Sequence, residues 1–208
     1  MLTKREATLA DVDPLVDLHM RSFDPEEFSM KLGEPFVRRF YQQVVTSEDT
    51  RITVGVAADG RIFCYSIGFI GYRAFQSRMK RSMLLPLALH ILTTLVRGRV
   101  REVFSIVAYA LEKTASIPDD VVDYHIGLIA VDDRGKTPAQ VRFFYKLFAE
   151  TVEFVKRKSG GKCWTSIFAD NPSSMRIATD VIKPDEKFPF RSLPKTTTGL
   201  ICRGAPGG

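Results

Sequence analysis

The sequence has few cysteines and lacks the signature motifs of several large protein classes. Its three cysteines, Cys64, Cys163 and Cys202, are far apart in the sequence and have apolar or β-prone neighbours, so they predict neither a disulfide framework nor a metal-binding pair. No spacing of His, Cys, Asp and Glu resembles a metal site, and no glycine-rich P-loop or dinucleotide-binding motif occurs. We therefore expect no bound metal and a reducing compartment.

Long apolar segments are also scarce. The first residues alternate charged and apolar side chains without the apolar core of a secretory signal, which predicts a cytoplasmic protein. The longest apolar run, Met83 to Val96, is shorter than the ~20 residues that a membrane-spanning helix needs, and it contains Pro86 and His90. The sequence thus argues against a transmembrane span.

The remaining composition is that of a folded protein. Hydrophobic residues make up 45% of the 208 residues, and no Pro/Gly/Ser-rich linker divides them, so we expect a single domain over 1–208, with a flexible tail at 203–208. The net charge of +6 favours anionic ligands. A basic cluster near Lys156 follows a predicted helix and complements the helix dipole, so nucleic acid need not be a partner.

Hydrophobic periodicity predicts an α/β fold. The first part reads as a strand at 2–9, a helix after Asp11, a helix at 33–45 and a β-hairpin at 51–57 and 61–70. A helical hairpin is expected as an insertion at about 76–116. A strand at 124–131, a long helix that ends at Gly160, a strand at 163–169, a helix at 174–181 and weaker strand signals at 188–202 follow.

This order of elements is similar to that of the GCN5-related N-acetyltransferase (GNAT) superfamily. In that family the fourth strand ends in an apolar-x-Val sequence, a loop before the long helix cradles the CoA pyrophosphate, and an Asn after the fifth strand contacts the cofactor. Here Ile129-Ala130-Val131, the loop Asp132 to Val141, and Asn171 stand at those places. The resemblance implies a mixed, mostly antiparallel sheet flanked by helices, with acetyl-CoA as the acyl donor.

The resemblance also implies a set of cofactor-binding residues. The family's loop pattern contains glycines, and it can be aligned with this sequence in two registers, one starting at Arg134 and one at Lys136. At least one glycine is missing in both. Helix phase favours the register at Lys136, because the other would bury Arg142. Backbone N–H groups at the start of a helix attract phosphate. The implied cofactor-binding residues are Ile129, Val131, Lys136, Thr137, Ala139, Gln140, Val141, Arg142 and Asn171.

The catalytic residues are less clear from the resemblance. Many family members use a Tyr after the Asn as general acid, and that place is Ala178 here; Tyr145 or Tyr124 could substitute, or the thiolate could leave unaided. Asp123 and His125 share one face of the predicted fourth strand and are our candidates for the base that deprotonates an amine. The alternative is that both make structural hydrogen bonds at a strand edge.

The last predictions concern the acceptor substrate and the binding partners. Asp24, Glu26 and Glu27 could hold a cationic small-molecule amine, or could form a solvated loop. The segments Leu32 to Phe36 and Phe40-Tyr41 resemble bacterial members associated with polysaccharide synthesis, which suggests an amino sugar. The insertion is expected to cover the acceptor cleft or form a homodimer contact; the alternative is docking on an anionic membrane. A non-catalytic CoA- or protein-binding member, and a peripheral membrane acyltransferase with a lipid-linked substrate, remain open.

Overall fold

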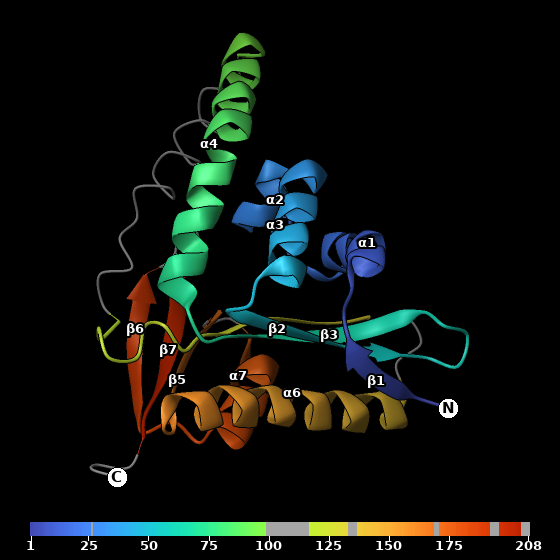
Figure 1. The fold of residues 1–208 in the computed structure, drawn as a ribbon, viewed down its shortest axis with the longest axis vertical. Helices are drawn as coiled ribbons and strands as arrows, with labels where there is room; N and C mark the ends of the chain where they lie inside the picture. The colour runs from blue at the N-terminus through green and yellow to red at the C-terminus, as the bar shows by residue number, and fades with distance from the viewer. Residues whose placement is uncertain (26, 99–116, 133–136, 169–170, 192–195, 205–208) are drawn as a thin grey trace.

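The computed structural model describes the chain apart from residues 26, 99–116, 133–136, 169–170, 192–195 and 205–208 (Figure 1). The strands are β1 (Thr3–Glu6), β2 (Thr50–Val56), β3 (Ile62–Phe69), β4 (Ile126–Val131), β5 (Lys162–Phe168), β6 (Glu186–Arg191) and β7 (Thr196–Arg203). The α-helices are α1 (Val12–Ser22), α2 (Phe28–Leu32), α3 (Glu34–Thr46), α4 (Tyr72–Val96), α6 (Pro138–Ser159) and α7 (Pro172–Ile182), and a short 3-10 helix covers Leu9–Asp11.

The strands form two antiparallel sheets that lie next to each other. One has the order β1-β2-β3-β4 and the other the order β5-β7-β6. The β2–β3 hairpin turns at Gly60, whose φ of +83° is readily adopted only by glycine. The predicted mixed, mostly antiparallel sheet is therefore confirmed, and the weak strand signals near the C-terminus prove to be the β6–β7 hairpin.

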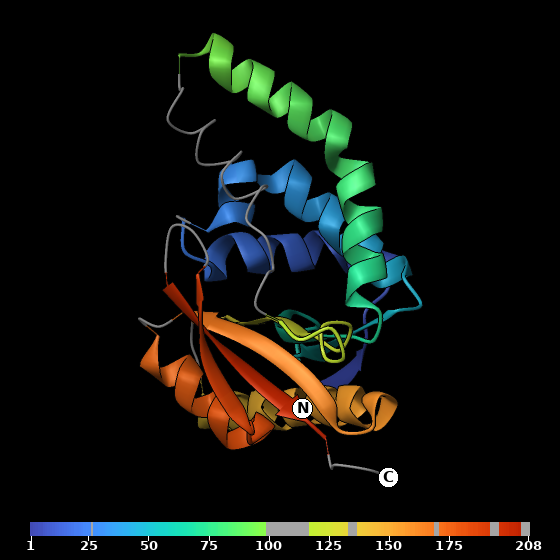
Figure 2. The same ribbon diagram turned by 90° about the vertical axis from the view of Figure 1, so that its left-hand side faces the viewer.

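Helices cover both faces of the four-stranded sheet (Figures 1 and 2). On one face α1 and α3 bury Leu15, Val37 and Val44 against strand residues such as Val54 and Ile67. On the opposite face α6 packs against β2, β3 and β4 and reaches β5 and α7. Because both faces are covered, every residue of β3 is buried.

Helix α6 forms as its sequence predicts. Phe144, Phe148, Val152 and Val155 recur at spacings of three and four residues and are buried. Its C-terminus is ended by Gly160 in the left-handed conformation. The predicted end of this helix is confirmed, and so is its apolar face from Phe144 onward; Val141, which the same pattern placed on that face, is 38% exposed.

The described part of the insertion is its first helix, α4, which spans Tyr72–Val96 and so begins earlier than the predicted start at 76. The second half of the predicted helical hairpin over 76–116 lies outside the described residues. The first half of α4 buries Phe75, Met79 and Met83 in the core, so the basic segment before the apolar run belongs to the same helix. By length and composition, the whole of α4 is long and apolar enough to cross a membrane, whereas the apolar run from Met83 to Val96 alone is too short.

Two further features were not visible in the sequence. A short helix, α2, forms within the stretch that we expected to be a loop. Cys163 and Cys202 lie directly opposite each other on β5 and β7 although they are far apart in sequence, and both are free thiols. Hydrogen bonding to Cys202, together with burial, raises the pKa of Cys163, so this thiol stays protonated at neutral pH.

Candidate functional site

The two sheets meet at one point and then separate. His125, just before β4, forms a parallel bridge with Trp164 of β5, the Trp164 N–H donates to the Tyr124 carbonyl over 2.9 Å, and the Thr165 hydroxyl donates to the Ile126 carbonyl over 2.8 Å. Beyond these contacts β4 and β5 belong to different sheets, and no further pairing joins them among the described residues. The split leaves the edge of β4 facing the edge of β5, with Val131 at its far end.

His125 closes the joined end of this split. Its ring stacks on Trp164 with centroids 4.0 Å apart, and it contacts Tyr72 at 4.3 Å and Phe69 at 5.6 Å. Its Nδ1 atom is buried and lacks a hydrogen-bond partner within the described part of the chain. Burial lowers the pKa of His125 to about 3, so the imidazole is neutral at pH 7 and only weakly basic.

Asp123 lies beside His125 but faces the start of α4. Its carboxylate accepts a hydrogen bond of 3.0 Å from the Arg73 backbone N–H and pairs with the Arg73 guanidinium at 3.4 Å. An acidic group at a helix N-terminus is stabilised by the unpaired N–H groups and the helix dipole. These contacts are the structural hydrogen bonds that the sequence left open as an alternative, and a catalytic role for Asp123 and His125 stays a prediction.

The N-terminus of α6 adjoins the loop that follows β4. Thr137 caps the helix: its hydroxyl accepts from the Gln140 N–H at 3.2 Å, and the Gln140 side chain accepts from the Thr137 N–H at 3.0 Å. Pro138 has no N–H, so the Ala139 N–H is the first helix donor without a partner among the described residues. Arg142 is exposed, which agrees with the register that starts at Lys136; Val141 is exposed as well, and Lys136 lies outside the described residues.

The end of β4 is held in place by polar contacts. Asp132 is buried, its N–H donates to the Phe63 carbonyl over 2.7 Å, and its carboxylate pairs with Arg61 and, at 3.9 Å, with Arg21. Ile129 pairs with Ser66 through the backbone, and Val131 packs against the core under α6. The strand end that should precede the phosphate loop is therefore rigidly positioned.

The second side of the split is formed by the start of α7. Asn171 is exposed and caps this helix, because its Oδ1 atom accepts from the Ser174 N–H at 3.0 Å. Ala178 is buried in the core cluster that includes Phe148 and Val152 of α6. Tyr145 is half-buried on α6 next to Phe144, so its suggested role as an acid stays a prediction.

The acidic residues predicted to bind an amine lie before α2. Asp24 and Glu27 are partly buried, and the Glu27 N–H donates to the Asp24 carbonyl at 2.9 Å; Glu26 lies outside the described residues. The charge of Glu27 contributes to raising the pKa values of Tyr41 and Tyr65, although burial is the larger cause. One of the predicted acidic residues thus lies near a buried polar cluster.

We did not predict this polar cluster from the sequence; it consists of His19, Ser29, Tyr41 and Tyr65. His19 Nδ1 is 3.0 Å from the Tyr41 hydroxyl, His19 Nε2 is 2.9 Å from the Ser29 hydroxyl, and Tyr41 donates to Tyr65. Tyr65 pairs with Ala130 of β4, so the cluster lies on the α1–α3 side next to the split. Such a cluster could have been inferred from polar residues that lie on otherwise apolar faces. When these residues are buried, their polar atoms need hydrogen-bond partners.

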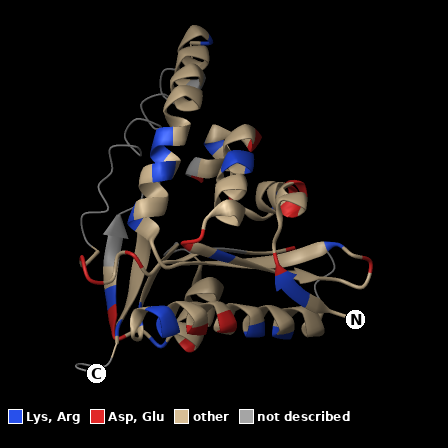
Figure 3. Cartoon of the chain, in the orientation of Figure 1, with Lys and Arg blue, Asp and Glu red and all other residues tan. Residues whose placement is uncertain are grey.

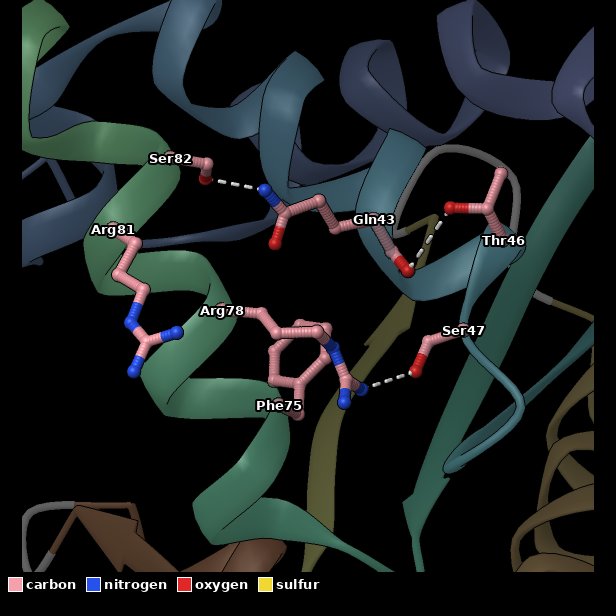
Figure 4. A pocket seen from close by; sticks show the side chains of 7 residues that line it. All are labelled: Gln43, Thr46, Ser47, Phe75, Arg78, Arg81 and Ser82. Atoms are coloured by element: carbon pink, nitrogen blue, oxygen red, sulfur yellow. Dashed lines mark hydrogen bonds between the residues drawn. The ribbon is translucent and has the colours of Figure 1, made fainter.

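A separate open cavity of about 610 Å³ lies between α3 and α4 (Figure 4). Gln43 donates to the Ser82 hydroxyl across it, and Arg78 donates to the Ser47 hydroxyl at 2.8 Å. Arg78 also pairs with Asp49 at 2.7 Å, which neutralises its charge. Gln43, Ser47 and Arg78 in its lining thus already have partners, whereas Arg81 lines the cavity without an ion pair among the described residues.

Comparisons with known proteins agree with this geometry. No protein-family model matches the sequence, and no relative is found among curated proteins. Solved structures do match, at low identity. One is NAA60 from Arabidopsis thaliana in complex with acetyl-CoA, with a TM-score of 0.57, 10% identity, and 97% of this chain and 98% of that chain covered.

Two bacterial structures give the same result. An acetyltransferase from Desulfovibrio desulfuricans assigned to the GNAT family has a TM-score of 0.53 at 12% identity over 97% of this chain and 98% of that chain. The ribosomal-protein-S18-alanine N-acetyltransferase from Escherichia coli has a TM-score of 0.51 at 9% identity over 97% of this chain and 91% of that chain. The chain therefore has the fold of the GNAT acetyltransferases.

Proposed function

We propose that this protein transfers an acetyl group from acetyl-CoA to an amine. The observation that carries the proposal is the split between β4 and β5, with the N-terminus of α6 at one side and the Asn171 cap of α7 at the other. The similar NAA60 structure contains acetyl-CoA, and the other similar structures are also acetyltransferases. A likeness in fold supports the reaction class but leaves the acceptor open.

The split suits an extended thioester ligand. The unpaired edge of β4 offers backbone N–H and C=O groups to the cofactor arm, and an N–H there can polarise the thioester carbonyl. The amine nitrogen attacks the carbonyl carbon, the C–S bond breaks and the sulfur leaves as a thiolate, while the proton released from the attacking nitrogen passes to solvent. A thiol has a pKa near ~8.5, so this leaving group departs without an acid at Ala178.

His125 is better suited to holding the two sheets together than to proton abstraction. With a pKa of about 3 it is a weak base at neutral pH, and its neighbours are aromatic rings. We therefore propose that the amine loses its proton to water and reacts as the free base. In that case the rate rises with pH along the titration of the amine, and no limb near pH 6.5 appears in the pH–rate profile.

The acceptor that we propose is a cationic small amine. Asp24 and Glu27 provide negative charge on the α1–α3 side of the split, next to the polar cluster. An amino sugar is the finer proposal, from the resemblance noted in the sequence. Phe36, Phe40 and Tyr41, which carry part of that resemblance, pack in the core, so they support the fold and do not select the acceptor.

Calorimetry with acetyl-CoA tests the proposal directly. We expect binding that Ala139→Asp weakens by about tenfold or more, because a carboxylate placed at the α6 N-terminus repels phosphate. The matched control is Ala74→Asp, which puts the same charge on an exposed residue of α4. Absence of binding by the wild type would exclude acetyl transfer, and equal effects of the two substitutions would place the ligand elsewhere.

A non-catalytic relative that binds acyl-CoA is the second candidate. It is favoured by the buried Ala178 at the place of the usual acid and by the low pKa of His125. Incubating the protein and acetyl-CoA with an amino sugar, a polyamine and a peptide amine separates the two candidates. Thiol release with any of these amines supports the enzyme, whereas binding without amine-dependent thiol release supports the non-catalytic protein.

A further inference from the structure

The outer half of α4 exposes an unusual amount of apolar surface. After Met83 the helix leaves the core and continues away from the body of the molecule, and it changes direction partway along (Figure 2). It contains Pro86, which lacks the N–H group that would continue the hydrogen-bond ladder. Six apolar side chains on this half have exposed fractions from 44% to 81%, namely Leu84, Leu85, Leu89, Leu92, Leu95 and Val96. Isolated exposed leucines are ordinary, but a continuous patch marks an interaction surface.

Four of these six apolar residues lie in line with two arginines on one side of the helix. Arg78, Arg81, Leu85, Leu89, Leu92 and Val96 follow one another at spacings of three or four residues, which place them along a single stripe. The side chains at the opposite side, Met83 and Thr94, are buried. We call the stripe from Arg78 to Val96 the α4 stripe. At its inner end Arg78 is paired with Asp49, Arg81 carries a charge without an ion pair among the described residues, and apolar side chains follow.

The charge around the α4 stripe is positive throughout. The sequence has no Asp or Glu between Asp59 and Glu102, whereas Lys80 and Arg81 precede the apolar half and Arg97 follows it. Figure 3 shows α4 with basic bands below, an apolar length above and a basic tip, and without acidic residues. Lys80, Arg81 and Arg97 form no ion pair within the described part of the chain.

A second copy of the chain is a poor partner for such a surface. If two α4 helices paired in parallel, the same basic residues of both copies would lie side by side. If they paired antiparallel, Arg97 of one copy would lie beside Arg81 of the other. Both arrangements bring positive charges together, and α4 has no carboxylate to separate them. A surface of anionic lipid offers apolar chains next to negative headgroups, which matches the apolar centre and the basic ends. Charge complementarity therefore selects the lipid surface.

The length of the exposed half of α4 determines whether this helix would span a membrane or lie along its surface. Leu84 to Val96 extends over about 20 Å at ~1.5 Å per residue, which is less than the hydrocarbon core of about 30 Å. Full insertion would also bury Arg97, and the inner half of α4 is fixed to the core by Phe75, Met79 and Met83. A helix with these limits lies along the membrane–water interface with its basic residues at the headgroups.

We propose that the α4 stripe docks this protein on an anionic membrane surface. The inference does not depend on acetyl transfer, because it concerns a surface away from the split, and it can be measured without acetyl-CoA. The sequence left such docking open as the alternative to a covering or dimer-contact role for this insertion, and the exposure of the outer half of α4 is what favours it. An acetyltransferase held in this way would meet acceptors at the membrane.

Co-sedimentation of the full chain with vesicles tests the proposal. We expect binding to phosphatidylcholine vesicles that contain phosphatidylserine, and weaker binding to pure phosphatidylcholine. The variant Leu85→Ser/Leu89→Ser/Leu92→Ser should lower the partition coefficient by more than about tenfold, because three apolar side chains no longer enter the apolar layer. Leu9→Ser is the control, since it removes one exposed leucine outside α4 and should leave binding unchanged.

A second variant tests the charges. Lys80→Gln/Arg81→Gln should lower binding to the anionic vesicles by about fivefold for each charge removed and should reduce its salt dependence. Circular dichroism checks that each variant is folded. The proposal is overturned if the wild type binds neither vesicle, if the triple variant binds as well as the wild type, or if the wild type is a dimer that the triple variant disperses and no vesicle is bound.

Discussion

The two faces of the four-stranded sheet are built in different ways. On the α6 face the helix presents one apolar side, is capped at both ends and contacts the sheet along its length. The opposite face carries the polar cluster of His19, Ser29, Tyr41 and Tyr65, and its longest helix, α4, leaves half its length exposed. The α6 face is a conventional core, whereas the other face includes polar groups and uncovered surface that stability alone does not require.

This difference suggests a division of roles. An apolar, capped layer stabilises the sheet and aims the N-terminus of α6 at the split. Buried polar groups cost free energy unless they are paired, and exposed apolar surface brings no folding free energy, so both features of the α1–α4 face are better explained by binding or chemistry. The proposed division of roles is wrong if substitutions on the two faces have the same effect on stability.

The largest expected effect is on the α6 face. Phe148 is 1% exposed and packs between α6 and the core of β4, β5 and α7. Phe148→Ala should lower the free energy of unfolding by about 3–5 kcal/mol, because it leaves a cavity in this layer. Urea denaturation measures the change.

The matched control for Phe148→Ala lies on α4. Leu85 is 70% exposed, so Leu85→Ala should change the free energy of unfolding by less than about 0.5 kcal/mol. A large loss of stability in Leu85→Ala would mean that the α4 stripe is covered within the folded chain. In that case the contrast between the two faces, and with it the docking proposal, would be wrong.

Acid should affect the α1–α4 face first. Burial lowers the pKa of His19 to about 4 from an ordinary value near 6.5, so the unfolded chain binds more protons than the folded one between these values. The stabilisation is complete above about pH 6.5 and is lost as the pH falls towards 4. Between pH 7 and pH 5 it amounts to about 2 kcal/mol for this residue.

Denaturation at several pH values separates His19 from the other groups. His19→Gln keeps hydrogen-bonding capacity next to Tyr41 and Ser29 but does not titrate, so its stability should fall less steeply between pH 7 and pH 5. His125, whose pKa is also lowered, contributes in the same direction in both proteins. Identical slopes for wild type and variant would show that His19 is not buried in its neutral form.

The sequence predicted the parts of the fold that depend on local pattern. The apolar spacing of Phe144 and Phe148, the turn of the β2–β3 hairpin and the helix end at Gly160 each act within a few residues, and each was confirmed. Helix α4 was predicted poorly, since its apolar residues surround the helix and give no face to locate. The extent of a helix then depends on packing, which here joins Phe75 and Met83 to the core.

The candidate site was predicted only in outline. The position of the split follows from the order of elements, so Val131 and Asn171 could be assigned from the resemblance. The contacts between His19, Tyr41 and Tyr65 could not, because they join helices and a strand that are distant in sequence. The neighbours of His125 were hidden for the same reason: Phe69, Tyr72 and Trp164 come from three separate elements.

The smallest expected effect concerns the cap of α6. Thr137→Ala removes the acceptor of the Gln140 N–H and should lower the free energy of unfolding by about 1 kcal/mol, whereas Thr137→Ser should restore it. Thr46→Ala is the control, because its hydroxyl donates to the Gln42 carbonyl near a helix C-terminus and caps no N–H group.

The same variant also tests whether this helix start binds phosphate. Without the Thr137 hydroxyl, the Gln140 N–H has no partner in the free protein and is available to an anion, so acetyl-CoA should raise the melting temperature of Thr137→Ala by at least as much as that of the wild type. A smaller rise would mean that the Thr137 hydroxyl itself binds the ligand. The cap would then be part of the binding site and not a competitor for its donors.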